Sequence, residues 1–146
     1  MEVLLGSEDV RPLGQLMDGT CVRQSFSPVA PVLVLVSIRM TKRLNDEPGF
    51  LYLDVVEVVS RRVLGTSTAM VDEMESDGWC MFETEAELKV GKRYELMLRT
   101  LNCRAGMCPV VYCGRSSADG YLFMGSKMER GAELACRMAY GNVRLG

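Results

Sequence analysis

A short alternating segment places the strongest constraint on the fold of this chain. The segment Lys92–Thr100 reads KRYELMLRT. Its residues Tyr94, Leu96 and Leu98 share one side of an extended strand, and mostly charged residues occupy the other side. This alternation is typical of an antiparallel strand with one face in a core and the other in solvent. The sequence therefore predicts an antiparallel β protein.

Other apolar or alternating runs, separated by turn signals, predict further strands of the same kind. The turn Asn45–Gly49, NDEPG, carries Pro and Gly where a tight turn needs them. The predicted strands are Val32–Met40, Phe50–Val59, Thr66–Val71, Trp79–Thr84, Cys108–Gly114 and Tyr121–Gly125. Short strands with turns every 8–12 residues indicate a small antiparallel barrel of about six to seven strands.

Two segments have helical spacing instead. In Gly131–Gly141, GAELACRMAYG, the apolar residues fall at Leu134, Ala135, Met138 and Ala139, which predicts a C-terminal helix ended by a glycine. Near the N-terminus the spacing of Val10, Leu13, Leu16 and Met17 indicates a short helix. We therefore expect an N-terminal extension over residues 1–30 and one barrel domain with a C-terminal helix over residues 31–146.

The composition narrows the possible functions. The 146 residues contain 48% hydrophobic and 25% charged residues, as in ordinary globular domains, and no histidine. Without histidine, Ser-His and Cys-His dyads, a His-ligated zinc and an imidazole base are excluded. The net charge of −2 offers no general attraction to nucleic acid or anionic lipid. We expect a protein that is not an enzyme and that uses no cofactor.

The cysteines are predicted to be buried thiols. Cys103, Cys108 and Cys113 are evenly spaced, but zinc sites use closer pairs and a fourth ligand is missing. The six cysteines lie in apolar runs without a preceding secretory signal, which favours reduced thiols and a cytoplasmic location. The longest apolar run, Val29–Ile38, is too short to span a bilayer, so membrane insertion is not expected.

Two groups of charged residues are candidate binding sites. Arginine forks suit bidentate contacts with phosphate, and they occur at Arg39, Arg43, Arg61 and Arg62. The acidic residues Asp72, Glu73, Glu75 and Asp77 precede Gly78. The segment does not match the calcium-loop pattern, because Met74 and Asp77 occupy the positions for an oxygen ligand and for glycine. From the residues alone, we expect this segment to be a solvated turn with Gly78 at positive φ.

From Arg39 to Tyr140 the order of motifs resembles that of the PilZ domain family. The resemblance rests on RMTKR, which contains R-x-x-x-R, on a polar turn ending in Gly78, and on LKVG before an alternating strand. It also rests on CPVVYCG and on a last strand, YLFMG. In that family the arginines and the polar turn bind cyclic di-GMP. The resemblance therefore implies a ligand site formed by Arg39 and Arg43, with Arg61 and Arg62 as substitutes, and by a turn containing Gly78.

The turn departs from the family pattern. Aligning it on Gly78 places Glu73 and Glu75 at the acid and serine positions, whereas aligning it on Asp72 displaces Ser76. A carboxylate at the serine position would repel a phosphate. The resemblance thus implies a signalling or adaptor module that binds cyclic di-GMP weakly or not at all and acts through a protein partner or a homo-oligomer. An alternative is an OB-fold barrel that binds single-stranded nucleic acid or a protein.

Overall fold

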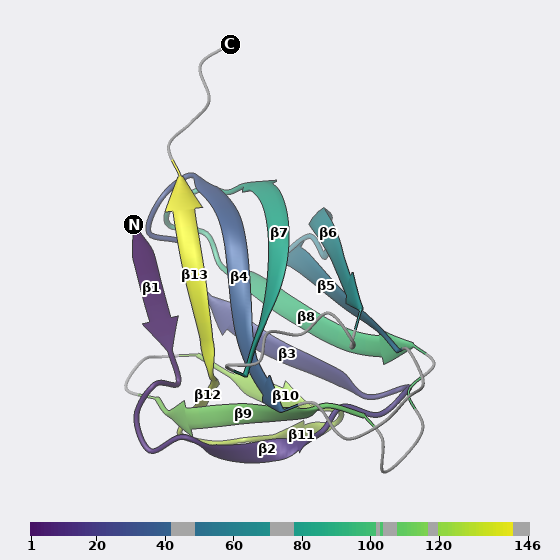
Figure 1. Cartoon of the computed structure of the whole chain (residues 1–146). Helices are drawn as coiled ribbons and strands as arrows, with labels where there is room; N and C mark the ends of the chain where they lie inside the picture. Colours follow the sequence, from purple (N-terminus) through teal and green to yellow (C-terminus); the bar gives the residue numbers. More distant parts are fainter. Residues whose placement is uncertain (42–48, 71–77, 102, 104–107, 117–119, 142–146) are drawn as a thin grey trace.

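In the computed structural model, residues 1–41, 49–70, 78–101, 103, 108–116 and 120–141 are described, and all their regular structure is β-strand. None of the described segments forms a helix that could cross a bilayer. The strands are Glu2–Leu5 (β1), Arg11–Gln15 (β2), Cys21–Phe26 (β3), Val32–Thr41 (β4), Phe50–Glu57 (β5), Val63–Met70 (β6), Trp79–Glu87 (β7), Tyr94–Leu101 (β8), Val110–Arg115 (β9), Leu122–Met124 (β10), Lys127–Met128 (β11), Ala132–Leu134 (β12) and Cys136–Gly141 (β13) (Figure 1).

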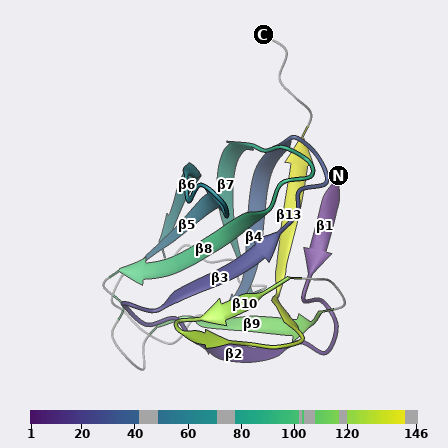
Figure 2. The same ribbon diagram turned by 180° about the vertical axis from the view of Figure 1, so that it is seen from behind.

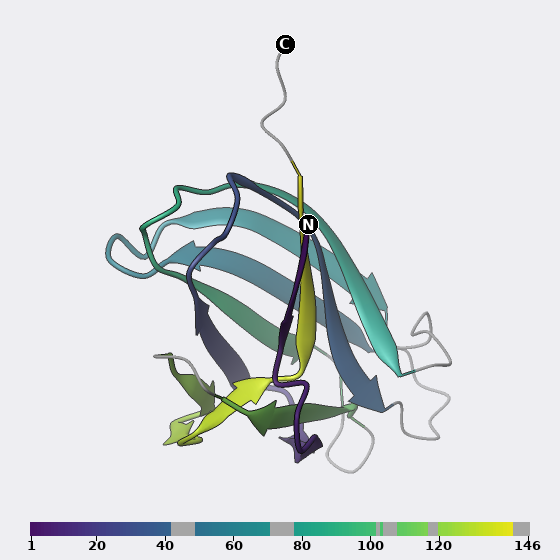
Figure 3. The same ribbon diagram turned by 90° about the vertical axis from the view of Figure 1, so that its left-hand side faces the viewer.

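The strands form two antiparallel sheets. One sheet has the order β1-β13-β4-β9-β12, with β7 paired to β4 and β2 paired to β9. The other has the order β11-β10-β3-β8-β5-β6. Figure 3 shows β1, β13, β4 and β7 on one side of the interior and β3, β8, β5 and β6 on the other. Seen from behind, β3 and β8 cross β4 and β13 obliquely (Figure 2).

The core lies between these two sheets. The alternation predicted for Lys92–Thr100 is confirmed, because Tyr94, Leu96 and Leu98 of β8 are all buried. They face an interior to which β4 contributes Val36 and Ile38. The predicted strands around β4 to β10 are also present, with shifted ends. The sequence thus located the strands that build most of the core.

The predicted C-terminal helix is wrong. Its residues form β12 and β13, and β13 pairs with β4 on one side and β1 on the other. Cys136, Met138 and Tyr140 are buried, whereas the residues between them are only half-buried. The segment therefore satisfies both a helical and a two-residue period. Pairing with the long strand β4 decides between them, since tertiary context overrides local propensity.

The predicted N-terminal helix is also wrong. Residues 11–15 form β2, which pairs with β9, and Leu16 is buried while Val10 and Met17 are exposed. Pro12 lies inside the segment, where a helix interior would lose a backbone hydrogen bond. The first thirty residues also supply β1 and β3, which pair with β13 and β8. They are thus part of the two sheets.

A closed barrel is not formed by the described residues. β7 is an edge strand of one sheet and β6 an edge strand of the other, and no backbone ladder joins these two strands. They are nevertheless neighbours, because a hollow between them is lined by Gly65 and Thr66 of β6 and by Glu83 and Thr84 of β7. At this hollow the Thr84 hydroxyl packs against Gly65, so these edges meet through side chains, and no ladder pairs them. The predicted barrel is therefore corrected to two facing sheets.

Candidate functional site

Arg39 lies beside the glycine that ends the acidic segment. In the pairing of β4 with β7, Arg39 is opposite Trp79, and the Met40 N–H donates a 2.8 Å hydrogen bond to the Gly78 carbonyl oxygen. Gly78 has a φ of 87°, which confirms the predicted left-handed backbone at this glycine. Arg39 and Gly78 are therefore brought together by the β4–β7 ladder.

Two further strands bring aromatic and basic side chains to the same place. Arg137 of β13 stacks on Trp79, with its guanidinium carbon 3.8 Å from the ring centroid. The Arg39 guanidinium carbon lies 5.9 Å from the ring centroids of both Trp79 and Tyr112. Tyr112 of β9 is held in place by a 2.5 Å hydrogen bond between its hydroxyl and that of Thr41. The result is a cluster of two guanidinium groups among two aromatic rings, hereafter the Arg39–Arg137 cluster.

Two cavities share Trp79 and Arg137 in their lining. One, of about 270 Å³, is lined by both arginines and by the backbone and side chains of the segment that follows β1, including Gly6 and Ser7. The other, of about 350 Å³, is lined by Trp79 and Arg137 together with apolar side chains such as Met81. The stack is thus the wall shared by two hollows of the size of a small ligand.

The charge of this cluster is not neutralised within the described part of the chain. Neither Arg39 nor Arg137 forms an ion pair with a described residue, whereas Arg99 pairs with Asp54 at 3.7 Å. Glu2 lines both cavities, but no ion pair joins it to either arginine. The Nε of Arg137 is also buried and has no hydrogen-bond partner among the described residues. A buried N–H donor without an acceptor is costly, and an anion at this wall would supply one.

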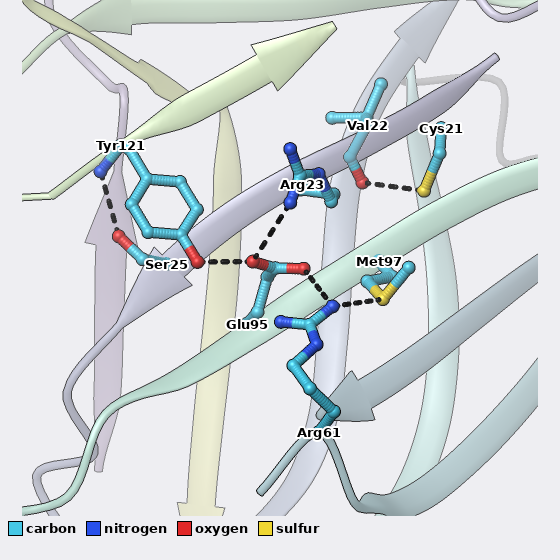
Figure 4. Close-up of polar contacts among 8 residues, drawn as sticks. All are labelled: Cys21, Val22, Arg23, Ser25, Arg61, Glu95, Met97 and Tyr121. Carbon is cyan, nitrogen blue, oxygen red and sulfur yellow. Dashed lines mark hydrogen bonds and ion pairs between the residues drawn. The ribbon is translucent and has the colours of Figure 1, made fainter. Parts of the chain in front are cut away.

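A second polar cluster lies on the outer face of the other sheet, centred on Glu95 of β8. The Glu95 carboxylate is fully buried and pairs with Arg61 at 3.3 Å and Arg23 at 3.9 Å (Figure 4). The Tyr121 hydroxyl donates a short hydrogen bond to its second oxygen. Arg61 adopts a left-handed φ of 59° in the turn after β5. Because both arginines are occupied by this carboxylate, the Glu95 cluster holds a turn and a strand together rather than offering free cations.

Tyr121 provides a test of this cluster. Burial, together with the hydrogen bond to Glu95 and its charge, raises the pKa of Tyr121 from 10 to about 12. The folded protein therefore retains the phenolic proton more tightly than the unfolded chain does, and this contribution to stability is lost as the pH rises from 10 to 12. We expect the urea midpoint of Tyr121→Phe to fall less than that of the wild type over this range. An equal fall in both proteins would contradict the Glu95 contact.

The predicted binding residues do not all lie together. Arg62 lies near the end of β7, in a hollow with Glu57 and Lys92. This hollow is lined by Glu85 and Glu87 of β7, so it lies about 20–26 Å along the strand from Trp79 at about 3.3 Å per residue. Arg61 belongs to the Glu95 cluster. The remaining predicted residues, Arg43, Asp72, Glu73 and Ser76, lie outside the described residues.

Five of the six cysteines are buried, which confirms this part of the prediction for them, whereas Cys21 is only half-buried. No group of three metal-ligating side chains that could hold an ion occurs among the residues the structure describes. Desolvation raises the pKa of Cys80 and of Cys136 to about 12. Such thiols are poor nucleophiles at neutral pH.

Sequence reasoning missed Trp79, Tyr112 and Arg137 as site residues. Arg137 was hidden in a segment that predicted a helix, and Tyr112 reaches Arg39 only because β9 pairs with the end of β4. The signal that could have been used is Trp79, because it is the single tryptophan of the chain and follows directly on Gly78.

No protein-family model matches this sequence, and a comparison with the curated proteins finds no match.

Proposed function

We propose that the protein is a binding module for a small anionic ligand with a planar ring, taken up at the Arg39–Arg137 cluster. The resemblance to PilZ domains makes cyclic di-GMP the first ligand to test, and a response to it would make the protein a signalling or adaptor module. The observation that carries the proposal is the buried Arg137 Nε, which has no hydrogen-bond partner among the described residues and belongs to a cluster of two guanidinium groups that no described carboxylate neutralises.

The chemistry of the cluster supports an anion combined with a ring. Guanidinium forks bind phosphate or carboxylate oxygens in pairs, and they also stack on planar groups. Trp79 and Tyr112 provide aromatic surface within reach of the same guanidinium groups. A ligand with only one of these two features would leave either the charge or the aromatic surface unused. A nucleotide carries both.

Binding of a protein partner is the second candidate function, and it is favoured by the apolar side chains next to the Arg39–Arg137 cluster. Met81 is half-exposed, and it lines the larger cavity with Leu35 and Ala139. Apolar and aromatic side chains beside arginines are the composition of many protein interfaces. In this case the protein partner or second copy would cover Trp79 in place of a small ligand.

The single tryptophan allows a direct experiment. We expect cyclic di-GMP to change the emission of Trp79, with saturation below about 100 μM, as a signalling receptor requires. Arg39→Ala and Arg137→Ala should each weaken binding by at least about tenfold, because each removes a charge-assisted contact. Arg62→Ala is the matched control, since its exposed side chain lies away from the cluster.

The same titration separates the alternatives. GMP and inorganic phosphate test whether ring and anion are both needed, and a short oligonucleotide tests the nucleic-acid alternative. If the emission of Trp79 stays unchanged with cyclic di-GMP, GMP, inorganic phosphate and the oligonucleotide, the small-ligand proposal is overturned. Light scattering then decides between the remaining outcomes. A dimeric mass that becomes monomeric in Met81→Arg would support contact between copies of this chain through this face.

A further inference from the structure

Three parts of the chain place hydrogen-bond donors around the smaller cavity of the Arg39–Arg137 cluster. Arg39 comes from β4 and Arg137 from β13, and Ser7 lies in the segment between β1 and β2. Ser7 is exposed and lines this cavity of about 270 Å³. The buried Nε of Arg137 adds an N–H donor that has no acceptor among the described residues. The donors at this cavity therefore come from three separate elements.

The segment that carries Ser7 is fixed on both sides of this residue. The Gly6 N–H donates a 3.2 Å hydrogen bond to the carboxylate of Glu133, and the Glu8 carbonyl oxygen accepts a 2.8 Å hydrogen bond from the Arg115 N–H. Glu133 and Arg115 belong to the paired strands β12 and β9. Ser7 is thus held in place before a ligand binds, which reduces the entropy lost on binding.

The acidic residues that follow Ser7 pair with another cation. Glu8 forms a charged hydrogen bond with Arg115, and an Asp9 carboxylate oxygen lies 3.6 Å from the same guanidinium group. Neither Glu8 nor Asp9 lines the smaller cavity. An anion bound in this cavity would therefore not face these two carboxylates directly.

The charges at the cavity favour an anion with more than one negative charge. Both guanidinium groups of the cluster line it, and no described carboxylate pairs with either. Glu2 also lines it, but Glu2 is exposed, so water weakens the repulsion between its carboxylate and an anion. A phosphate monoester carries between about 1.5 and 2 negative charges at pH 7, whereas a phosphate diester or a carboxylate carries a single one.

We infer that the ligand of this cavity is a phosphate monoester attached to a ring, and that Ser7 is the residue that distinguishes it from other anions. The inference rests on the proposed binding of a small anion at the Arg39–Arg137 cluster. A monoester has three free oxygens, which can accept from the two guanidinium forks and from the Ser7 hydroxyl at the same time. A carboxylate or a diester has two free oxygens, one fewer than the number of side chains that donate.

Three small compounds vary the anion and keep an aromatic ring. Phenyl phosphate is a monoester, diphenyl phosphate is a diester and benzoate is a carboxylate. We expect titration calorimetry of the full chain to give a Kd for phenyl phosphate at least about tenfold lower than for either of the others. In Ser7→Ala the affinity for phenyl phosphate should fall about tenfold, because a charge-assisted hydrogen bond is lost, whereas the affinity for benzoate should change little.

Two further variants test the position and the charge of this site. Ser37→Ala is the matched control for Ser7→Ala, since Ser37 lines the larger cavity and not the smaller one. It should retain the wild-type preference for phenyl phosphate over benzoate. Glu2→Gln should bind phenyl phosphate more tightly than the wild type, because it removes a charge that repels the anion, and it should gain less affinity for benzoate.

The outcomes distinguish this inference from the proposed function. Equal affinity for phenyl phosphate and benzoate, tighter binding of diphenyl phosphate, or an unchanged preference in Ser7→Ala would each overturn the monoester and leave the anion site in place. If phenyl phosphate does not bind but cyclic di-GMP or GMP still changes the emission of Trp79, this inference alone is overturned. If none of these compounds binds, both are overturned.

Discussion

Replacing both Arg23 and Arg61 with alanine is expected to lower the free energy of unfolding by about 3–5 kcal/mol. The two guanidinium groups are the cationic partners of the Glu95 carboxylate, which is fully buried. Without them, the carboxylate retains the Tyr121 hydroxyl but no opposite charge. A buried charge without a counter-charge is among the most destabilising defects that a substitution can create.

This effect should depend on the charge of Glu95 and not on lost arginine packing. Adding Glu95→Gln to the double variant should restore much of the stability, because an amide is far less costly to bury than a carboxylate. Arg99→Ala is the matched control. Arg99 is exposed and pairs with Asp54 at 3.7 Å, so its loss should cost less than about 1 kcal/mol. Urea unfolding of the double variant, of the double variant with Glu95→Gln and of Arg99→Ala measures the three free energies of unfolding. An equal loss of stability in Arg99→Ala and in the double variant would contradict the role of Glu95.

Gly114→Ala is expected to destabilise the protein by about 3 kcal/mol, the upper end of the cost of overpacking. A Cβ atom on Gly114 would collide with the Gly6 carbonyl oxygen and would lie 2.6 Å from the Glu8 carbonyl oxygen. These neighbours are backbone, which cannot rotate away as a side chain can. The same Glu8 oxygen accepts a 2.8 Å hydrogen bond from the Arg115 N–H, so moving it would break this contact.

The substitution should also reach the proposed ligand site, because Gly6 and Ser7 line its smaller cavity. We expect ligand binding by Gly114→Ala to weaken even at temperatures where the variant remains folded. Gly141→Ala is the control, since a Cβ there would lie 3.3 Å from a methyl group of Val34, a side chain that can shift. It should remain within about 1 kcal/mol of the wild type. Comparable losses in the two variants would show that the close approach at Gly114 is unimportant.

The Glu95 and Gly114 contacts show why the sequence could not reveal the whole structure. The alternation in Lys92–Thr100 places Glu95 on the solvent side of β8, and the strand is found with that orientation. That the carboxylate is nonetheless fully buried depends on Arg23, Arg61 and Tyr121, which come from three distant parts of the chain. Local alternation specifies the face of a strand but not what covers that face.

The candidate site was accessible to sequence reasoning only in part. Arg39 and Gly78 could be selected from residue type and spacing, because guanidinium groups suit anions and glycine suits positive φ. Arg61 and Arg62 met the same criterion but lie elsewhere, in the Glu95 cluster and in a hollow near the end of β7. Residue type alone could not distinguish arginines occupied by a carboxylate from arginines that no described carboxylate neutralises.

The predominantly β character, the positions of most strands and the side of β8 that faces the core could be predicted without the structure. These properties follow from alternation and turn residues within a few positions of one another. The folded structure was needed to show that Gly131–Gly141 is extended, that the strands form two facing sheets, and that Arg137 stacks on Trp79. Each of these depends on pairing between strands far apart in the chain, and the hydrogen bonds and burial gained there outweigh local preference.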